Sequence, residues 1–436
     1  MHNRARRLAI VAGVAALALI GSPKSSAQSP RSGGLALVGG TVYVDPTQPP
    51  IAEGVVTVRD GKIAAVGRKG AVSLEGLEVI DSSGLMIVAG FWNSHVHFIE
   101  RKWAGAAQAP AAELDEPLRD MLTQYGFTSV FDTGSTWANT KALRDRIESG
   151  EVTGPRIHST GDILFPKGGA PAPLILDVLG AMRIAMPEVD TADEARAAAQ
   201  KNLDAGTDGI KVYAVSLGWP ARSLSEAAIR AAADVAHERK KLVFAHPHTQ
   251  EGLLASVQGG ADVLVHTAPN AGVLGDAILA AMKRANVAVI PTLKLWRHEL
   301  RHERKSPRES FVAAGVDQLR AWSSMGGAVL FGTDVGYMDD YDPSDEYALM
   351  ADAGMSPMQI LASLTTAPAE RFGESSERGR IAPGLAADLV ALRGNPLRNV
   401  RAFADACYTI RGGRVLYAAG NCSAVTARAN SGHVQP

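Results

Sequence analysis

The sequence has no excess of charge of either sign. Its 436 residues include 44 lysines and arginines and 45 aspartates and glutamates, and the formal net charge at pH 7 is −1. Proteins that bind nucleic acid usually present a strongly basic surface to the phosphate backbone. The balanced charge therefore argues against a nucleic-acid partner, and we expect the partner to be a small-molecule substrate.

The apolar run near the N-terminus is short. It extends from Leu8 to Ile20, which is too few residues to cross a bilayer comfortably. Three arginines precede it, and the small residues Ser25-Ser26-Ala27 follow it, an order typical of a secretory signal peptide. We predict that residues 1–27 are removed and that the exported protein is periplasmic or secreted, without stable membrane insertion. An uncleaved membrane anchor is the alternative.

Cysteine is scarce, with only two residues in the chain, Cys407 and Cys422. Disulfides form in exported proteins because their environment is oxidising. An even pair of cysteines in such a protein can be joined. We therefore expect a bridge that ties the C-terminal tail, residues 421–436, to the last hairpin.

Aromatic residues are also few, at 6% of the chain, whereas alanine is frequent and there are 44 glycines. This composition is typical of a compact α/β enzyme with many tight turns between strands and helices. A chain of 436 residues is long enough for one large domain and one smaller domain.

Both ends of the chain carry short apolar strands separated by turn residues. Residues 35–88 and 381–420 show this pattern, and Asp60-Gly61 is typical of a two-residue hairpin turn. We predict that the two regions together form one small β-domain. Its expected strands include Leu35–Val38, Thr41–Val44, Gly54–Val58, Lys62–Val66, Cys407–Arg411 and Arg414–Tyr417.

Between these regions, residues 89–380 alternate between helices and short apolar strands. The patterns Thr191-x-x-Glu194 and Ser223-x-x-Glu226 predict capping boxes that open two of the helices. Strands separated by helices pair in parallel through right-handed crossovers, and eight such units close into a barrel. We predict an α/β fold in which a (β/α)8 TIM barrel is inserted in a small composite β-sandwich domain. The strands are expected near Ile87, Phe127, Arg156, Gly209, Lys241, Asp262, Val287 and Ala328.

Polar residues follow several of the predicted barrel strands. His95 and His97 lie in the stretch Phe91-Trp92-Asn93-Ser94-His95-Val96-His97-Phe98, and residues two apart on a strand share a face. In a barrel the C-terminal strand ends converge on one mouth. Imidazole and carboxylate groups suit Zn²⁺ and related ions, so the set predicts a metal site. Its other candidate members are Lys211, His246, His266 and Asp334.

Six candidate ligands are more than one tetrahedral ion requires, and we expect two divalent ions, most simply zinc, with a bridging hydroxide. Lys211 is unusual because an ammonium group cannot bind a cation. A lysine desolvated near metal charge can lose its proton and react with CO₂. The product, N6-carboxylysine, would offer one oxygen to each ion. A salt bridge at the barrel mouth is the alternative.

The order His-x-His, Lys, His, His, Asp along successive strands resembles the amidohydrolase superfamily. It is most similar to the imidazolonepropionase-like branch, which has a binuclear metal site and a carboxylated lysine and includes Xaa-Pro dipeptidases. The resemblance extends from about Leu35 to Tyr417. The matching segments are Trp92–His97, Gly209–Lys211, Phe244–His246, Val265-His266, Gly332–Asp334 and, at the return to the β-domain, Pro383–Leu389.

The resemblance implies a role for each of these residues. His95 and His97 would bind the more buried ion together with Asp334. The two later histidines of the set would bind the more exposed ion, and carboxylated Lys211 would bridge both. Asp334 would also be the catalytic residue, taking a proton from the attacking hydroxide and passing it to the leaving group.

Two residues depart from the family pattern or compete with it. Asn93 stands where many members have aspartate, and we interpret it as a change in a residue that supports the ligands. His248 lies two residues beyond His246 and shares its face, so it competes for the ligand role. We favour His246 as the ligand and expect His248, Tyr213 and Tyr337 to contact substrate.

Together these patterns predict an exported, metal-dependent hydrolase that cleaves a C–N bond, in an amide or a dipeptide. Two alternatives stay open: the same site could hydrolyse a lactone or a phosphoester, or the chain could be an inactive periplasmic binding protein. Every ligand position holds a competent residue type, which argues against the binding protein. Asp132 and His158, also at strand ends, are expected to hydrogen-bond or pack. The sequence is compatible with a homo-oligomer.

Overall fold

The computed structural model describes residues 34–172, 176–177, 180–183, 186–216, 221–420 and 422. The predicted signal peptide and nearly all of the tail after residue 420 lie outside these described residues. Within them, no helix combines the length and the apolar character that a membrane crossing needs.

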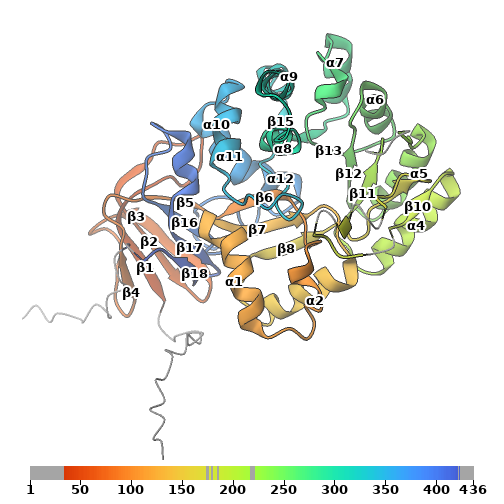
Figure 1. Ribbon diagram of the computed structural model, residues 1–436. Coiled ribbons are helices and arrows are strands. Elements are labelled where there is room, and N and C mark those ends of the chain that lie inside the picture. Colours follow the sequence, from red (N-terminus) through yellow and green to blue (C-terminus); the bar gives the residue numbers. More distant parts are fainter. Residues whose placement is uncertain are drawn as a thin grey trace, which may run out of the picture. The chain divides into compact units, whose positions relative to one another are not determined.

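Strands from both ends of the chain form one eight-stranded sheet, as Figure 1 shows. The strand order is β18-β17-β16-β5-β1-β2-β3, and β4 pairs with β1. Strands β16 and β5 pair antiparallel and so join the two ends. This confirms the composite domain expected from the sequence. The strands are β1 (Leu35–Val42), β2 (Ile51–Arg59), β3 (Lys62–Arg68), β4 (Glu78–Asp81), β5 (Met86–Ala89), β16 (Leu389–Leu392), β17 (Ala406–Arg411) and β18 (Arg414–Ala418).

Strand β1 is continuous, although the sequence pattern predicted two strands with a break after Val38. Gly39 has a φ of 91°, and the register of pairing with β2 shifts between Val38 and Gly40. A bulge of this kind interrupts the alternation of side chains without ending the strand. The prediction of two strands was therefore wrong.

The C-terminal hairpin is tied down by the expected disulfide. Cys407 on β17 is bonded to Cys422, with 5.9 Å between their Cα atoms. The bridge holds the chain against the sheet just after its last strand, as the sequence predicted.

Eight parallel strands in two sheets make up the barrel. They are β6 (Phe91–Val96), β7 (Phe127–Asp132) and β8 (Arg156–Ser159) in one sheet, and β11 (Gly209–Tyr213), β12 (Leu242–His246), β13 (Val263–Val265), β14 (Ala288–Ile290) and β15 (Ala328–Val329) in the other. Backbone hydrogen bonds join the sheets at both seams. Leu164 N donates to Lys211 O (2.9 Å) beside β11, and Ser94 N donates to Phe331 O (2.7 Å) beside β6. The ring of eight strands matches the predicted barrel.

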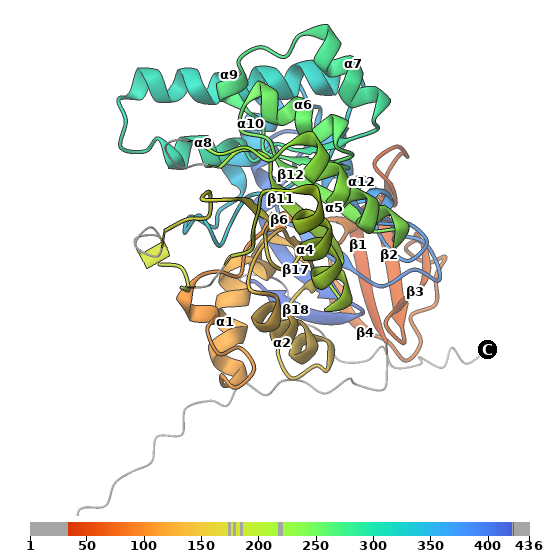
Figure 2. The same cartoon turned by 90° about the vertical axis from the view of Figure 1, so that its right-hand side faces the viewer.

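The helices pack on the outside of these strands, and Figures 1 and 2 show α4 to α7 over β11 to β13. Side chains of β13 alternate between two cores: Val263 and Val265 join a cluster of strand residues, whereas Leu264 joins the cluster that includes the helices. Strands covered on both faces are apolar throughout, which explains the short unbroken apolar runs in the sequence. The helices are α1 (Ala111–Met121), α2 (Trp137–Glu148), α4 (Ala192–Asp204), α5 (Glu226–Glu238), α6 (Gln250–Gln258), α7 (Asp276–Arg284), α8 (Leu293–Glu299), α9 (Lys305–Ser324), α10 (Ser344–Asp352), α11 (Pro357–Leu364) and α12 (Thr366–Arg371).

One predicted capping box is correct and the other is not. Thr191 and Glu194 cap α4 reciprocally, as expected. Helix α5, however, is capped by Ser225, whose hydroxyl accepts from Ala228 N at 3.1 Å. Ser223 lies before the cap and forms a β-bridge with Val215.

Asp388, just before β16, joins the chain-end sheet to the barrel. Its carboxylate contacts Arg156 Nη1 (3.1 Å) and Arg378 Nε (3.4 Å) and accepts a hydrogen bond from Gly412 N (2.8 Å). Its carbonyl accepts from Gly90 N (2.8 Å), at the start of the barrel. Asp388 is 4% exposed, so these contacts are shielded from water.

We predict that Asp388→Asn lowers the free energy of unfolding by about 3–5 kcal/mol, because it leaves two shielded arginines without their common carboxylate. Urea unfolding measures the loss. Asp317→Asn is the control, because the side chain of Asp317 is 64% exposed beside Arg320 and such pairs contribute about 1 kcal/mol or less. Equal losses in the two variants would contradict the assigned role of Asp388.

Candidate metal centre

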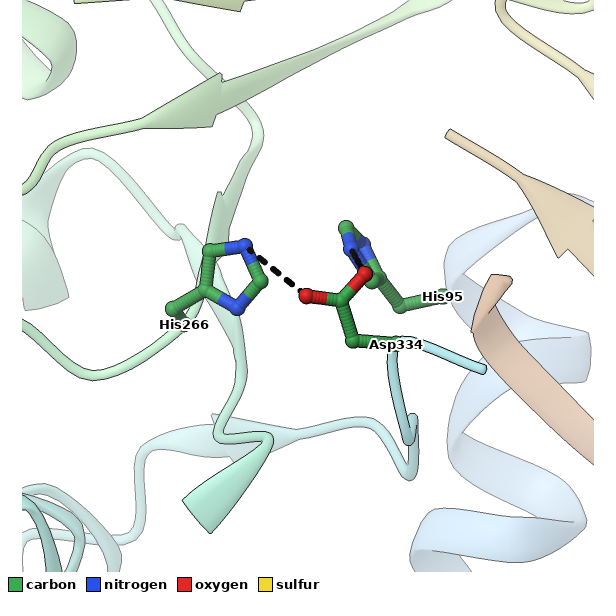
Figure 3. Close-up of side chains that lie close together, drawn as sticks. All are labelled: His95, His266 and Asp334. Atoms are coloured by element: carbon green, nitrogen blue, oxygen red, sulfur yellow. Dashed lines mark hydrogen bonds and ion pairs between the residues drawn. The ribbon is translucent and has the colours of Figure 1, made fainter. Parts of the chain in front are cut away.

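Asp334 lies at the centre of three histidines. Its Oδ1 is 3.0 Å from His95 Nε2 and 3.0 Å from His97 Nε2, and its Oδ2 is 3.9 Å from His266 Nε2. Figure 3 shows the carboxylate between the rings of His95 and His266. Ligand atoms of His95, His266 and Asp334 all lie within 4.8 Å of one another, a spacing that a single divalent ion could span.

His246 and Lys211 adjoin this group. The ring centroid of His246 is 4.6 Å from that of His266, and neither of its ring nitrogens has a hydrogen-bond partner among the described residues. A buried polar atom without a partner is costly, and a metal ion would satisfy it. Lys211 Nζ lies 5.7 Å from the ring centroid of Tyr213, whose ring stacks on that of His246. The structure therefore places His246 and Lys211 next to the group of histidines around Asp334.

Hydrogen bonds to Nδ1 orient two of these rings. His97 Nδ1 lies 2.6 Å from the carbonyl of Gly134, which can only accept, so this nitrogen carries the proton. The lone pair of His97 Nε2 is then free on the side of Asp334. His95 Nδ1 lies 2.7 Å from Thr133 Oγ1. Partners of this kind fix the ring of a metal-binding histidine.

Burial controls the charge of the set. It lowers the pKa of His95 to about 3 and those of His246 and His266 well below the usual value, so these imidazoles are neutral. Burial also lowers the pKa of Lys211 to about 7, against the opposing pull of Asp334. A substantial fraction of Lys211 is therefore free amine at neutral pH.

Burial alone would raise the pKa of the Asp334 carboxyl. The close contacts of its Oδ1 with His95 and His97 outweigh this effect and hold the pKa well below its usual range. Asp334 is thus an anion in contact with the imidazole nitrogens of His95 and His97. This combination of donors suits a divalent cation.

The family model of the amidohydrolase family matches residues 86–416, more than two thirds of the sequence. The chain belongs to the amidohydrolase family. It is accordingly a hydrolase that acts on carbon–nitrogen bonds, and enzymes of this family generally use divalent metals.

Known proteins resemble the amidohydrolase along most of its length. Ochratoxinase from Aspergillus niger is 24% identical over 399 residues, which cover 82% of this chain and 80% of that protein. A prolidase solved with N-methylphosphonate-L-proline superposes with a TM-score of 0.70 and 26% identity, covering 88% of this chain and 99% of its own. A Xaa-Pro dipeptidase solved with methionine in its active site gives a TM-score of 0.75 at 21% identity, with coverages of 88% and 100%.

The three residues expected to contact substrate lie around the metal centre of the amidohydrolase. The ring of Tyr213 stacks on that of His246, with 4.4 Å between centroids. Tyr337 OH donates to Glu299 Oε1 at 2.8 Å. His248 is partly exposed, and its Nε2 lies 3.2 Å from Asn270 Nδ2. Their contact with substrate stays a prediction.

The strand-end residues expected to be structural do hydrogen-bond or pack. Asp132 accepts hydrogen bonds from Ser135 Oγ (2.7 Å) and Ser159 Oγ (2.9 Å). His158 stacks on Trp92, with 5.3 Å between centroids, and its Nε2 lies 2.9 Å from Glu374. Neither residue belongs to the metal centre.

Sequence reasoning missed Thr133 and Thr292, which contact the Nδ1 atoms of His95 and His266. Both threonines directly follow a predicted barrel strand. Their position at the barrel mouth could have marked them as candidates. A threonine after a strand is common, however, and the sequence does not show which residue it contacts.

We predict that Zn²⁺ raises the melting temperature of the amidohydrolase, because an ion that binds only the folded state stabilises it, by about 2.7 kcal/mol at one hundred times the Kd. His246→Asn should bind about one ion per chain fewer, because one ligand set is broken. Elemental analysis and thermal unfolding with and without a chelator measure both effects. His237→Asn, a histidine that pairs with Asp262 outside the centre, is the control and should retain the wild-type response.

Proposed function

We propose that the protein is an exported amidohydrolase that uses divalent ions, most simply two zinc ions, to cleave an amide or dipeptide bond at the barrel mouth. The observation that carries this proposal is the convergence of His95, His97 and His266 on Asp334, with distances of 3.0, 3.0 and 3.9 Å. The similarity to a prolidase, a dipeptidase and ochratoxinase favours an amide substrate.

Each residue has a defined part in this proposal. Bound ions would make a nucleophile available from water near pH 7 and polarise the scissile carbonyl. Asp334 is ionised, so it can accept the proton that the nucleophile releases and deliver it to the leaving nitrogen. His95, His246 and His266 stay neutral, so each has a nitrogen lone pair that an ion could use. Tyr213 and Tyr337 would line the substrate pocket.

Lys211 would act as a carbamate. Lys211 is 1% exposed, and burial lowers the pKa of its amine to about 7, so the free amine can attack CO₂ at neutral pH. The attack forms an N–C bond and releases one proton, leaving N6-carboxylysine. Its two carboxyl oxygens would then be available as ligands for the ions.

The direct test of the proposed function is a substrate screen with purified, metal-replete protein. We expect turnover of a dipeptide or an N-acyl amino acid, with Xaa-Pro dipeptides as the first probes. Lactones and phosphotriesters complete the panel. Turnover of these esters alone, with no cleavage of any amide, would contradict the proposal.

We predict that Asp334→Asn reduces kcat by at least about a hundredfold, because general acid–base catalysis typically contributes 10²–10⁴-fold. The fold should be retained, as far-ultraviolet circular dichroism would show. Asp339→Asn changes an exposed carboxylate of the same loop and should leave kcat within about threefold of wild type. Near-normal turnover by the Asp334 variant would refute its proton-transfer role.

We predict that Lys211→Ala loses bound metal and activity, and that short carboxylic acids such as acetate restore part of both by replacing the carbamate oxygens. Lys294→Ala is the matched control. Lys294 is also a buried lysine, at 5% exposed, but its Nζ pairs with Asp340 at 2.8 Å. Any loss in that variant should not respond to acetate. Full metal occupancy without Lys211 would remove the carbamate from the proposal.

A further inference from the structure

Thr292 occupies the N-cap position of α8 but does not cap the helix. Threonine at this position normally accepts a hydrogen bond from one of the first helical N–H groups. Its backbone is instead left-handed, with φ 42° and ψ 49°, and its side chain makes no cap hydrogen bond to the described residues of α8. The hydroxyl is therefore available for another partner.

That partner is a predicted metal ligand. Thr292 Oγ1 lies 2.5 Å from His266 Nδ1 and 2.9 Å from the carbonyl of Pro291. The Pro291 carbonyl can only accept, so a Thr292 hydroxyl that donates to it turns an oxygen lone pair toward the ring. In that arrangement His266 Nδ1 is the protonated nitrogen. The lone pair of His266 Nε2 is left on the side of Asp334.

A residue from another helix supplies the missing cap. Glu346 on α10 accepts hydrogen bonds from Leu293 N (2.9 Å) and Lys294 N (2.7 Å), the first two amides of α8. Glu346 is fully buried, and a carboxylate beside a helix N-terminus is well placed for the helix dipole. Because Glu346 satisfies these amides, α8 does not need the hydroxyl of Thr292.

The arrangement is held by a strained backbone. Both Thr292 and His266 have positive φ angles, 42° and 74°, and both are buried. A positive φ is a genuine outlier for a β-branched residue such as threonine. Strain of this kind persists where surrounding contacts fix it, and it is concentrated at functional sites.

We propose that Thr292 is a positioning residue that keeps His266 in the Nδ1-protonated tautomer, with Nε2 presented to the metal centre. This inference concerns the same site as the proposed function, and it depends on that proposal for the presence of a bound ion. Thr292 itself touches neither metal nor substrate in this role. Outer residues that orient a metal-binding histidine typically change metal affinity or activity by 10–100-fold.

The first test compares Zn²⁺ affinity, measured with a competing chromophoric chelator, and the d–d spectrum of the Co²⁺-loaded protein. Thr292→Val keeps the branched shape but lacks the hydroxyl, and it should weaken binding of one ion by about 10–100-fold and alter the spectrum. Thr292→Ser should restore both. Thr409→Val removes another buried hydroxyl, bonded to Thr123 O at 2.6 Å, and should change neither. Wild-type affinity in Thr292→Val, or equal loss in Thr292→Ser, would overturn the proposal.

The second test needs no metal. Nitrogen-15 spectra of the metal-free, histidine-labelled protein distinguish the two tautomers, and His266→Asn assigns the signal. We expect Nδ1–H in the wild type and loss of this preference in Thr292→Val. An Nε2–H signal from wild-type His266 would overturn the role of Thr292. Failure of the wild type to bind any ion, with the expected tautomer present, would instead refute the proposed function and leave the positioning role supported.

Discussion

The seam that closes the barrel between its first strand and its last positions the candidate metal centre. Along it, Ser94 N donates to Phe331 O (2.7 Å), Asp334 N to His95 O (2.9 Å) and His97 N to Val335 O (2.8 Å). These bonds hold the two segments at one register, and a slip by one residue would turn Asp334 away from the histidines. Backbone pairing therefore brings together residues more than 230 positions apart in the sequence.

Small and polar residues make so close an approach feasible. A Cβ on Gly332 would lie 2.8 Å from His95 Cβ, and one on Gly336 would lie 1.8 Å from the carbonyl oxygen of His97. Asn93 fills the remaining gap: its Oδ1 accepts from Thr333 N (3.2 Å) and its Nδ2 donates to Thr333 Oγ1 (2.7 Å). An aspartate could make the second bond only if the threonine hydroxyl donated. The amide thus supports the seam with one fewer buried charge.

The sequence predicted the parts of this site that follow from local patterns, and it missed those that depend on contacts between distant residues. Strand periodicity and position located His95, Lys211 and the other ligands at strand ends, because both signals are local. The pairing of Thr292 with His266 could not be found in the same way. A local interpretation assigns its hydroxyl to α8, and only the folded chain shows that Glu346 caps that helix instead. The bulge at Gly39 likewise hid a continuous strand behind an interrupted pattern.

The predicted ligands point into the barrel mouth for two different structural reasons. On β12, Phe244 joins the inner strand cluster, and alternation directs His246 to the same side. The same rule would send His266 outward with Leu264, which packs among the helices. The left-handed backbone of His266, with φ 74°, turns the ring inward, and Asp334 with φ 66° follows a similar course. Such conformations cost about 1–3 kcal/mol each.

A glycine at either position would avoid the backbone strain, but it would have no side chain to bind an ion. Neighbouring contacts must therefore offset the strain. At Asp334, the strain is offset by the hydrogen bond that its backbone amide donates to His95 O at the seam. At His266 it comes from the bond of its own amide to Ile290 O (2.8 Å) and from Thr292. The residues with strained backbones are therefore also the residues that neighbouring hydrogen bonds hold in place. The rigidity that lets two non-glycine residues turn sharply at strand ends is also what fixes their donor atoms around one centre.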